Sequence, residues 1–461
     1  MPEKTDKLGN HAIVIGGSIA GLLSARVLAD KFERVTITER DQLPETPEAR
    51  KGVPQSSQPH ILFARGYSIL EALFPEIGKE LHAAGAIPID WAREFHHYNP
   101  GGWNATAESA SELVSFTCTR PLLEWTIRQQ VSQLPNVRFL KRCRVIGLLC
   151  NPSRTQVTGI SVRHLDESTT DELSAQLVVD ASGRTSQAPH WIENLGFTPP
   201  PATVVNPFLG YATRRYRISP GEQSDWKVLL VEHTPPHNTR LGYLAQVEGE
   251  ECIATLGGYG GDYPPLDNEE FLAFARSLPS PKFYETIRRA QPTSPIQAHR
   301  ATANRMYHYE RVNLPANFVA LGDAVCALCP VYGQGMTVSA MSAMVLQDWL
   351  GRQKSNSHTF NSSRFQKRLA QSNAQPWLVA TGQDSRFPTT QGASKPSWFT
   401  RLFRGYTDRL VQRTHEDAEL HTHLMEVAQM VKSPAVLFHP QVVLKTLLEG
   451  KRSESVSAWE K

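Results

Sequence analysis

Near its amino terminus the chain reads His11-Ala-Ile-Val-Ile-Gly16-Gly17-Ser18-Ile19-Ala20-Gly21. The first half of this stretch is apolar, rich in β-branched residues and ends in glycine, which predicts a buried strand. Apolar residues then recur at helical spacing over residues 18–29, and Arg34-Val-Thr-Ile-Thr-Glu39 returns to strand composition. A strand, a helix and a second strand within about 30 residues form a βαβ unit. Such units join parallel strands, so the stretch predicts a parallel sheet.

The turn after the first strand is typical of dinucleotide binding. In the pattern G-x-G-x-x-G, the first glycine allows a tight turn, the second lets the backbone approach a pyrophosphate, and the third permits close helix–strand packing. Gly16, Gly17, Ala20 and Gly21 fit this pattern, and Ser18 replaces the second glycine with a small residue that can donate to a phosphate. The positive dipole end of the following helix favours an anion at this place.

Glu39 ends the second predicted strand, where a carboxylate accepts hydrogen bonds from ribose hydroxyls. Such a carboxylate disfavours a 2′-phosphate, so we expect FAD or NAD rather than NADP in the dinucleotide site.

A second glycine-rich turn, near residue 320, decides between FAD and NAD. The sequence there is Phe318-Val-Ala-Leu-Gly322-Asp323-Ala324, followed by Pro330-Val-Tyr-Gly333-Gln334-Gly335-Met336. An apolar strand delivers Asp323 at its end, and the second glycine-rich segment opens a helix. Asp323 is expected to hold a ribityl hydroxyl, and the amides of 333–336 to face the negative part of a reduced isoalloxazine ring. The arrangement therefore favours FAD.

The composition limits the possible partners and locations. The chain has 461 residues, a formal net charge of +3 and six scattered cysteines. The basic residues are not gathered into a block, so no nucleic acid partner is expected. The polar start of the chain lacks the apolar stretch of a signal peptide, and no apolar run reaches the roughly 20 residues of a membrane span. We expect a cytoplasmic protein without a transmembrane segment, and the oligomeric state stays open.

The rest of the chain predicts two domains and a helical end. Helices are expected at 61–84, 120–133 and 334–350, strands at 137–140, 144–149, 156–164 and 176–180, and a proline-rich loop at 42–59. Successive strands with turns between them predict an antiparallel sheet between about 205 and 300. The expected fold is α/β (α+β overall), with a Rossmann-like FAD-binding domain (1–85, 119–203, 301–352), an antiparallel β-sheet substrate domain (86–118, 204–300) and a helical C-terminal region (353–461).

These motifs together resemble the FAD-dependent monooxygenases of the para-hydroxybenzoate hydroxylase type. Those enzymes share the amino-terminal dinucleotide turn, a mid-chain Asp-Gly segment, and a late Gly-Asp segment with Pro and Gly-Gln-Gly. The mid-chain segment here is Val178-Val-Asp180-Ala-Ser-Gly183-Arg184-Thr-Ser186, which has Asp-Ala-Ser-Gly in place of a strict Asp-Gly.

Within this class, four stretches are similar to an epoxidase-like branch that includes bacterial polyether polyene epoxidases and relatives of squalene monooxygenase. They are Arg50-Lys51-Gly52-Val53-Pro54-Gln55, Gln58-Pro59-His60, Arg120-Pro-Leu-Leu-Glu124 and Pro330-Val-Tyr-Gly-Gln-Gly-Met. The resemblance covers about residues 10–350. It implies that Arg120 reaches the phosphate or ribityl region of FAD and that Arg50 lies on the flavin side of its loop.

The resemblance also implies a reaction. NAD(P)H, docking transiently, reduces FAD, and O2 then adds to give a flavin C4a-hydroperoxide. This species epoxidises or hydroxylates an apolar small molecule, of the terpenoid or polyketide kind found in secondary metabolism. His60 is a candidate pocket base or flavin contact, with a packing role equally open, and no metal is expected. The expected cofactor-binding residues are Gly16, Gly17, Ser18, Ala20, Gly21, Glu39, Arg40, Arg50, Arg120, Val145, Asp180, Gly322, Asp323, Pro330, Gly333, Gln334, Gly335 and Met336.

Other functions fit the same fold: a flavin-dependent halogenase, a reductase of prenyl double bonds, and a non-catalytic flavoprotein. Halogenases typically carry a Trp-x-Trp-x-Ile-Pro stretch, and none of the nine tryptophans lies in one.

Three further groups of residues have less specific patterns. Cys326 and Cys329 have redox-pair spacing, although packing is the favoured interpretation. We expect His415, His421 and His423 on a solvated helix rather than around a metal. Four aromatic residues are candidates to line the substrate pocket: Tyr211, Trp226, Tyr243 and Tyr259.

Overall fold

The first part of the molecule is built around a five-stranded parallel sheet. The structure is a computed structural model that describes residues 7–218, 225–354 and 359–447. The strand order is β20-β11-β1-β2-β7, and every pair is parallel. The bounds are β1 Gly9–Ile15, β2 Phe32–Thr38, β7 Val137–Leu140, β11 Leu177–Asp180 and β20 Phe318–Ala320. The predicted βαβ unit is confirmed, because α1 (Ile19–Lys31) connects the neighbouring strands β1 and β2.

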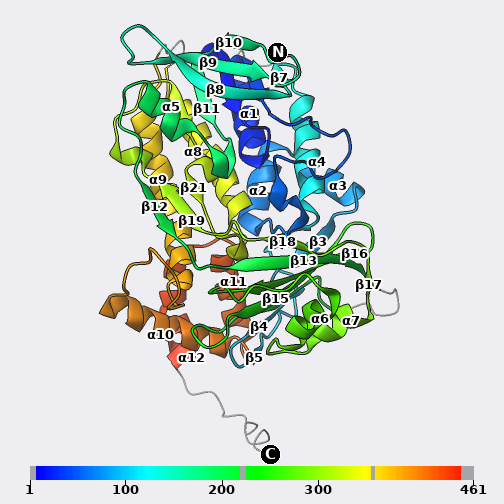
Figure 1. The fold of residues 1–461 in the computed structure, drawn as a ribbon. Coiled ribbons are helices and arrows are strands. Elements are labelled where there is room, and N and C mark those ends of the chain that lie inside the picture. Colours follow the sequence, from blue (N-terminus) through cyan, green and yellow to red (C-terminus); the bar gives the residue numbers. More distant parts are fainter. Residues whose placement is uncertain (1–6, 219–224, 355–358, 448–461) are drawn as a thin grey trace, which may run out of the picture.

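Helices and a smaller sheet cover this parallel sheet, which explains why its strands are apolar along most of their length. Helix α1 packs against α4 (Arg120–Ser132) and α8 (Gly335–Gly351), and α8 contacts α2 (Ala64–Leu73) and α9 (Ser362–Asp384), as Figure 1 shows. An antiparallel sheet of β8 (Cys143–Cys150), β9 (Val157–His164) and β10 (Thr170–Ser174) shares the same hydrophobic core.

The second part is an eight-stranded sheet, which lies below the parallel sheet in Figure 1. Its order is β17-β13-β16-β15-β14-β4-β5, with β18 also paired to β13, and only β4 and β14 are parallel. Helices α6 (Asn268–Arg276) and α7 (Lys282–Arg289) pack on the face that points away from the parallel sheet. The strands are β4 Phe95–Asn99, β5 Gly102–Trp103, β13 Gly210–Arg217, β14 Val228–Val231, β15 Arg240–Val247, β16 Glu251–Gly258, β17 Gln291–Pro292 and β18 Gln297–His299.

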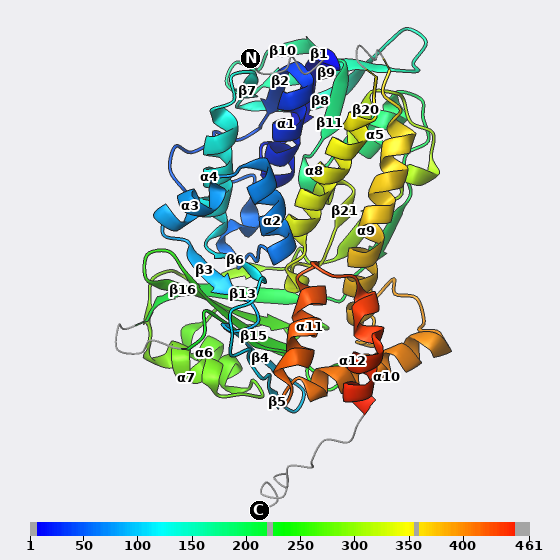
Figure 2. The same cartoon turned by 180° about the vertical axis from the view of Figure 1, so that it is seen from behind.

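Small sheets and the C-terminal helices complete the structure. The remaining elements are α3 Ile77–Ala83, β3 Ile87–Asp90, β6 Val114–Thr117, α5 Ala188–Asn194, β12 Ala202–Val205, β19 Asn304–Tyr307, β21 Cys326–Ala327, α10 Trp398–Arg413, α11 Ala418–Ala428 and α12 Pro440–Leu447. Helices α10, α11 and α12 gather beside the eight-stranded sheet (Figure 2), where Met425 of α11 joins a core cluster with Phe95 and Tyr243.

The predicted fold class is confirmed, and most predicted elements lie within a few residues of their expected bounds. The elements that the sequence patterns did not predict include β10, α6 and α7, together with α5, β12 and β19. Helix α6 did carry a start signal, because the Asp267 carboxylate accepts hydrogen bonds from the N–H groups of Glu269 and Glu270. Phe271 and Phe274 then follow at helical spacing and are buried.

None of the helices within the described ranges is long and apolar enough to cross a bilayer.

Candidate functional site

The turn after β1 requires glycine at two positions. Gly16 has a φ of +102°, and a β-carbon there would lie 2.6 Å from the carbonyl oxygen of Ala181, just beyond β11. A β-carbon on Gly21 would lie 1.8 Å from the carbonyl oxygen of Gly16. No side chain fits at that distance, so α1 can begin directly against the end of β1 only because both residues are glycine. The free N–H groups of the helix are thereby brought to the end of the sheet.

This turn follows β1, the strand from which the sheet extends in both directions. From β1 the chain continues to β2 and β7 on one side, and it later adds β11 and β20 on the other. The crevice outside the carboxyl ends of the strands at such a point is where open α/β sheets bind ligands. The second glycine-rich turn reaches the same place, because a β-carbon on Gly322, whose φ is +62°, would lie 2.8 Å from that of Ala20. The structure thus brings the two predicted turns into contact.

Glu39, at the end of β2, is buried and points back at the first turn. Its Oε2 accepts a hydrogen bond from the N–H of Gly17 at 2.9 Å, and its Oε1 accepts one from the N–H of Asp41 at 3.0 Å. Two neighbouring candidates point elsewhere. Arg40 is exposed and donates to the Gly52 carbonyl at 3.3 Å, and the Val145 side chain of β8 lies in the hydrophobic core.

Arg50, from the proline-rich loop, is the centre of a buried group of charges. Its Nη1 lies 3.1 Å from Oε2 of Glu39 and 2.9 Å from Oδ2 of Asp41, and its Nε lies 2.8 Å from Oε1 of Glu124. Burial lowers the pKa of the Arg50 guanidinium, but Glu124 and Glu39 raise it by more. Arg50 therefore remains charged and holds the loop against the end of β2.

Ser18 joins this group through its hydroxyl. It accepts a hydrogen bond from Nη2 of Arg120 at 2.7 Å and donates one to Oε2 of Glu124 at 2.6 Å. Arg120 and Glu124 are one turn apart on α4, and they also contact each other at 3.0 Å. Burial raises the pKa of the Glu124 carboxyl, but Arg120 and Arg50 more than offset this and hold it below its usual value.

The sequence analysis missed Glu124 and Asp41 as members of this site. The spacing of four residues between Arg120 and Glu124 was the available signal, because it places both side chains on one face of a helix. Asp41 had no comparable signal, since its contact with Arg50 depends on how the proline-rich loop folds back.

The aspartates after β11 and β20 have different surroundings. Asp180 is fully buried and accepts hydrogen bonds from the Ser186 hydroxyl at 2.5 Å and the Ser182 N–H at 3.0 Å. Asp323 lies in a recess with 32% of its side chain exposed, 3.7 Å from Nε of Arg184. Burial raises the pKa of both carboxyls. Asp323 is therefore the carboxyl group that a ligand in the crevice can reach, while Asp180 closes the mid-chain turn.

The turn before α8 lies against Ile61 and Phe63, the residues that follow the proline-rich loop. Gly333 has a φ of +66°, and a β-carbon on Gly335 would meet no atom within 4 Å. Gln334 is buried, and its Oε1 has no hydrogen-bond partner among the described residues. Pro330 is exposed at the start of the turn, and Met336 is buried in the first turn of α8.

His60 ends the proline-rich loop close to Arg120. Its Nδ1 donates to the Gln58 carbonyl oxygen at 2.8 Å. Burial, and then the charge of Arg120, lower the pKa of His60 to about 3. The imidazole is therefore neutral at pH 7, with Nε2 as an acceptor. Its role as a pocket base stays a prediction.

One face of the eight-stranded sheet is tied to this loop. The Thr213 hydroxyl on β13 donates to Oε1 of Gln58 at 2.6 Å and lies 2.7 Å from the Thr255 hydroxyl on β16. The loop therefore bridges from the end of β2 to the sheet. The face it reaches is opposite to the one that packs on α6 and α7.

Of the four aromatic candidates for the pocket, three lie on the loop side. Tyr211 and Tyr259 cluster with Tyr332 of the turn before α8, and Tyr243 clusters with Ile61 at the end of the loop. Trp226 belongs instead to the core beneath α6 and α7.

The cysteine pair and one of the three C-terminal histidines are buried. Burial raises the pKa of both Cys326 and Cys329, so both remain thiols at pH 7. The expectation of a solvated helix is wrong for His421, which is wholly buried 2.9 Å from Nδ2 of Asn104. In the part of the chain that the structure describes, no group of His, Cys, Asp and Glu side chains could hold a metal ion.

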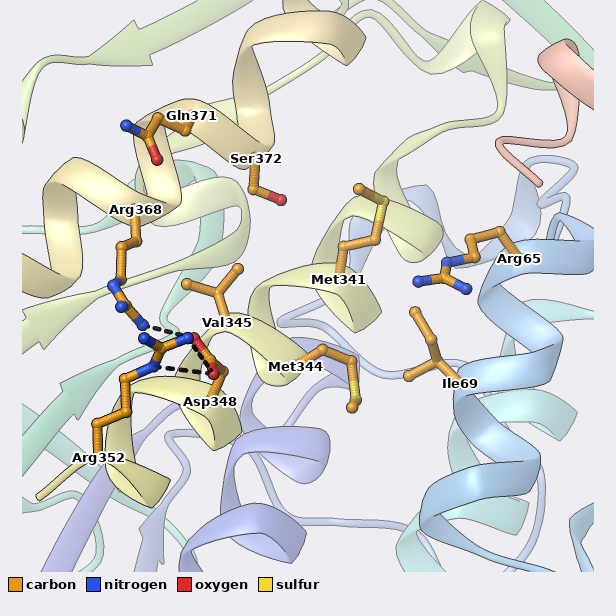
Figure 3. A pocket seen from close by; sticks show the side chains of 10 residues that line it. All are labelled: Arg65, Ile69, Met341, Met344, Val345, Asp348, Arg352, Arg368, Gln371 and Ser372. Atoms are coloured by element: carbon orange, nitrogen blue, oxygen red, sulfur yellow. Dashed lines mark hydrogen bonds and ion pairs between the residues drawn. The ribbon is translucent and has the colours of Figure 1, made fainter. Parts of the chain in front are cut away.

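Two open grooves lie away from this crevice. The larger, of about 440 Å³, runs between α2, α8 and α9, and Figure 3 shows Arg352 and Arg368 both directed at Asp348 within it. Its lining residues are Arg65, Ile69, Met341, Met344, Val345, Asp348, Arg352, Arg368, Gln371 and Ser372. The second, of about 360 Å³, lies between the loop after β2, α4 and β7. Neither groove contains a predicted site residue.

The residues of the crevice fit FAD. Nε of Arg120 and Oε1 of Gln334 are buried polar atoms without partners among the described residues, as expected where a polar ligand completes a site. Gly183 and Gly335 leave open space around their α-carbons. The Glu124 carboxylate accepts hydrogen bonds from Ser18 and Arg120, so a bound pyrophosphate would compete with it for these two donors.

Comparison with known proteins places the chain in a family. Protein Rv3254 of Mycobacterium tuberculosis (strain ATCC 25618 / H37Rv) is 30% identical in an alignment of 413 residues that covers 86% of this chain and 85% of that protein. The chain belongs to the family of Protein Rv3254. No protein-family model matches it.

Solved structures with the same fold are flavin-dependent enzymes. The flavin-dependent brominase Bmp2 matches with a TM-score of 0.63 and 13% identity over 93% of this chain and 97% of its own. PqsL from Pseudomonas aeruginosa, described as a probable FAD-dependent monooxygenase, matches with a TM-score of 0.55 and 16% identity over 91% of this chain and 100% of its own. These identities show a shared fold, and the resemblance to the epoxidase-like branch stays a prediction.

Proposed function

We propose that this member of the Rv3254 family is an FAD-dependent monooxygenase that uses NAD(P)H and O2 to epoxidise or hydroxylate a small apolar organic molecule. The observation that carries the proposal is the contact of Gly322 with Ala20. It joins the two glycine-rich turns at the carboxyl end of β1, where the chain adds β2 and β7 on one side and β11 and β20 on the other, which is where sheets of this kind bind ligands. The fold shared with Bmp2 and PqsL supports a flavin as the ligand.

In this proposal the crevice holds FAD along its length. Ser18, Arg120 and the first N–H groups of α1 bind the pyrophosphate, and Glu39 accepts from the ribose hydroxyls. Asp323 accepts from the ribityl chain, and the amides of residues 333–336 face the flavin ring. Bound FAD would accept hydride from NAD(P)H and, once reduced, react with O2.

The face of the eight-stranded sheet opposite α6 and α7 supports an apolar substrate. Tyr211 and Tyr243 are buried there, and the hydroxyls of Thr213 and Thr255 satisfy each other. Aromatic and aliphatic side chains on such a surface recognise a ligand mainly by apolar contact. Such a surface also excludes water from the flavin, which limits the loss of reducing equivalents.

The branch and the substrate class are part of the proposal. The similarity of the Arg50–Gln55, Gln58–His60 and Arg120–Glu124 stretches to the epoxidase-like branch supports a terpenoid or polyketide substrate of secondary metabolism. A flavin-dependent halogenase is the second candidate, because the structure of Bmp2 covers almost the whole chain.

One set of incubations tests these functions. The purified protein is loaded with FAD and mixed with NADH or NADPH, bromide, and a panel of terpenoid alkenes and phenols, in one series under isotopically labelled O2 and in a second series without O2. A monooxygenase incorporates the label into a product, and stopped-flow absorbance shows faster flavin reoxidation with O2 present. Bromide incorporation would instead indicate a halogenase, and anaerobic reduction of the alkene a prenyl reductase. Stoichiometric FAD without any substrate-dependent turnover would indicate a non-catalytic flavoprotein.

A further inference from the structure

Asp384, in the last turn of α9, is wholly buried among neutral partners. Its Oδ1 accepts a hydrogen bond from the hydroxyl of Tyr332 at 2.5 Å, and its Oδ2 accepts one from Nδ2 of Asn304 at 2.5 Å. No ion pair to Asp384 is found within residues 7–218, 225–354 and 359–447. Arg386, two positions further along, is paired to both carboxylate oxygens of Asp408 on α10. A carboxylate without a cation in such a place costs folding free energy, which is typical of positions that serve a function.

The two hydrogen bonds of Asp384 join α9 to the turn before α8. Tyr332 immediately precedes Gly333, the residue with positive φ in that turn. Asn304 of β19 holds the start of the same segment, because its Oδ1 accepts a hydrogen bond from the N–H of Cys329 at 2.7 Å. Asp384 thus contacts one end of the segment directly and the other end through Asn304.

On its other side Tyr332 faces the eight-stranded sheet. Its hydroxyl lies 3.3 Å from that of Tyr259, and the Tyr259 ring stacks on Phe387 at 4.3 Å. An ionised carboxylate can only accept hydrogen bonds, so Tyr332 has to donate to Asp384, and the Tyr259 hydroxyl can donate to the Tyr332 oxygen or to Asp384 itself. While Asp384 is ionised, it therefore fixes the Tyr332 hydroxyl as the donor in the hydrogen bond between the turn and α9.

We propose that Asp384 is a positioning residue of the flavin site, which acts through Tyr332 to hold the 330–335 turn in the conformation that faces the flavin. The flavin part of this proposal rests on the proposed function. The ordering of the turn by Asp384 does not depend on it. In this proposal, helix α9 contributes to the site because it carries Asp384.

Because of the surroundings of Asp384, we expect the strength with which it holds the 330–335 turn to depend on pH. Burial raises the pKa of Asp384 to about 6, although the hydrogen bonds from Tyr332 and Asn304 offset part of the rise. The hydrogen bond from Tyr332 is charge-assisted, and stronger, only while Asp384 is ionised. We therefore expect the turn to be held more firmly above about pH 6 than below it.

The other titratable groups around Asp384 keep one charge state between pH 5 and 7. Burial raises the pKa of the Cys329 thiol and of the hydroxyls of Tyr211, Tyr259 and Tyr332. Burial also lowers the pKa of His233, which packs on Tyr259, to about 4. The groups that face Asp384 or its tyrosine partners are Tyr211, Tyr259, Cys329 and Tyr332, with His233 and Arg386 beyond them.

Two measurements on the full chain test the proposal, with Asp384→Asn, Tyr332→Phe and Asp408→Asn compared to the parent protein between pH 5 and 8. The first is hydrogen exchange of the peptide that covers residues 328–336, without flavin. The second is FAD binding, followed by quenching of flavin fluorescence. Asp408→Asn is the matched control, because it removes a nearby carboxylate that contacts Arg386 and neither Tyr332 nor Asn304.

We expect Asp384→Asn and Tyr332→Phe to speed exchange of this peptide and to weaken FAD binding roughly tenfold at pH 8, the size expected for one charge-assisted hydrogen bond. In the parent protein and in Asp408→Asn, we expect the protection of this peptide, which is its exchange rate corrected for the base-catalysed rate of an unstructured amide, to increase as the pH rises through about 6. Asp384→Asn and Tyr332→Phe should both abolish this increase.

The proposal is overturned if exchange of the 328–336 peptide has the same rate and pH profile in Asp384→Asn as in the parent. If Asp384→Asn fails to fold, the pH profiles of the parent and of Tyr332→Phe decide in the same way. A parent protein that binds no FAD would refute the proposed function, while the exchange data would still support or overturn the positioning of the turn.

Discussion

The carbonyl oxygen of Gly16 lies 1.8 Å from the place where a β-carbon on Gly21 would stand. The end of β1 and the start of α1 are therefore in backbone contact. This contact fixes where the free N–H groups of the helix lie, and it places Ser18 between them and the carboxylate of Glu124. The position proposed for the pyrophosphate depends on this backbone contact.

Substitution of Gly21 by alanine tests that approach. The added methyl group has only backbone to meet, so we expect a loss of about 3 kcal/mol or more of unfolding free energy and loss of bound FAD. Gly405→Ala is the control, because a β-carbon there meets nothing within 4 Å and the residue lies inside α10. It should gain roughly 0.5–1 kcal/mol. Urea unfolding and the flavin absorbance of the purified proteins give both results, and a Gly21→Ala protein that is stable and yellow would contradict the structure.

Replacement of Arg50 tests the buried charges. In Arg50→Met the carboxylates of Glu39, Asp41 and Glu124 lose their common cation, and we expect a loss of about 3–5 kcal/mol in unfolding free energy. Arg142→Met removes an ion pair with Asp166 on the surface and should leave the urea midpoint unchanged. Equal midpoints for the two variants would mean that the Arg50 contacts contribute nothing.

The stability of Asp384→Asn should depend on pH in a defined direction. Because the folded-state pKa of Asp384 is raised to about 6, the parent protein loses stability as the pH rises from about 4 through 6. Two pKa units correspond to about 3 kcal/mol. Asp384→Asn lacks this loss, so its urea midpoint should gain on that of the parent between pH 4 and 7. If the difference between the urea midpoints of Asp384→Asn and the parent does not change with pH, the pKa of Asp384 is not raised in the folded protein.

His421 should give the opposite slope. Burial lowers its folded-state pKa to about 3, so stability is lost as the pH falls from about 6.5, where the unfolded chain takes up its proton. In His421→Gln we expect a smaller loss of stability between pH 7 and 4 than in the parent, by several kcal/mol. The exposed His190, changed to Gln, is the control. Parallel pH profiles of His421→Gln and the parent would contradict burial of this ring.

Local patterns in the sequence were enough to predict the parallel sheet and both glycine-rich turns. The strand β1, the helix α1 and the turn between them depend on residues that are neighbours in the chain, so their spacing carries the information. The same holds for Asp323 and for the helix after Gly335, which follow their strand and turn directly. Helices α6 and α7 were missed because their short amphipathic patterns lie among turn residues between strands.

The contacts that complete the site could not be predicted in this way. Arg50 meets Glu124, and Tyr332 meets Asp384, only after segments far apart in the sequence pack together. That packing decides that the Glu124 carboxylate contacts a cation and the Asp384 carboxylate a neutral hydroxyl. It also decides that His421 is buried rather than solvated. The sequence by itself thus determined the FAD-type fold and the glycines it requires, because these follow from local backbone geometry. Only the tertiary structure decided which charges surround Arg50 and which C-terminal residue contacts Tyr332, because burial and long-range contact are properties of the packed chain.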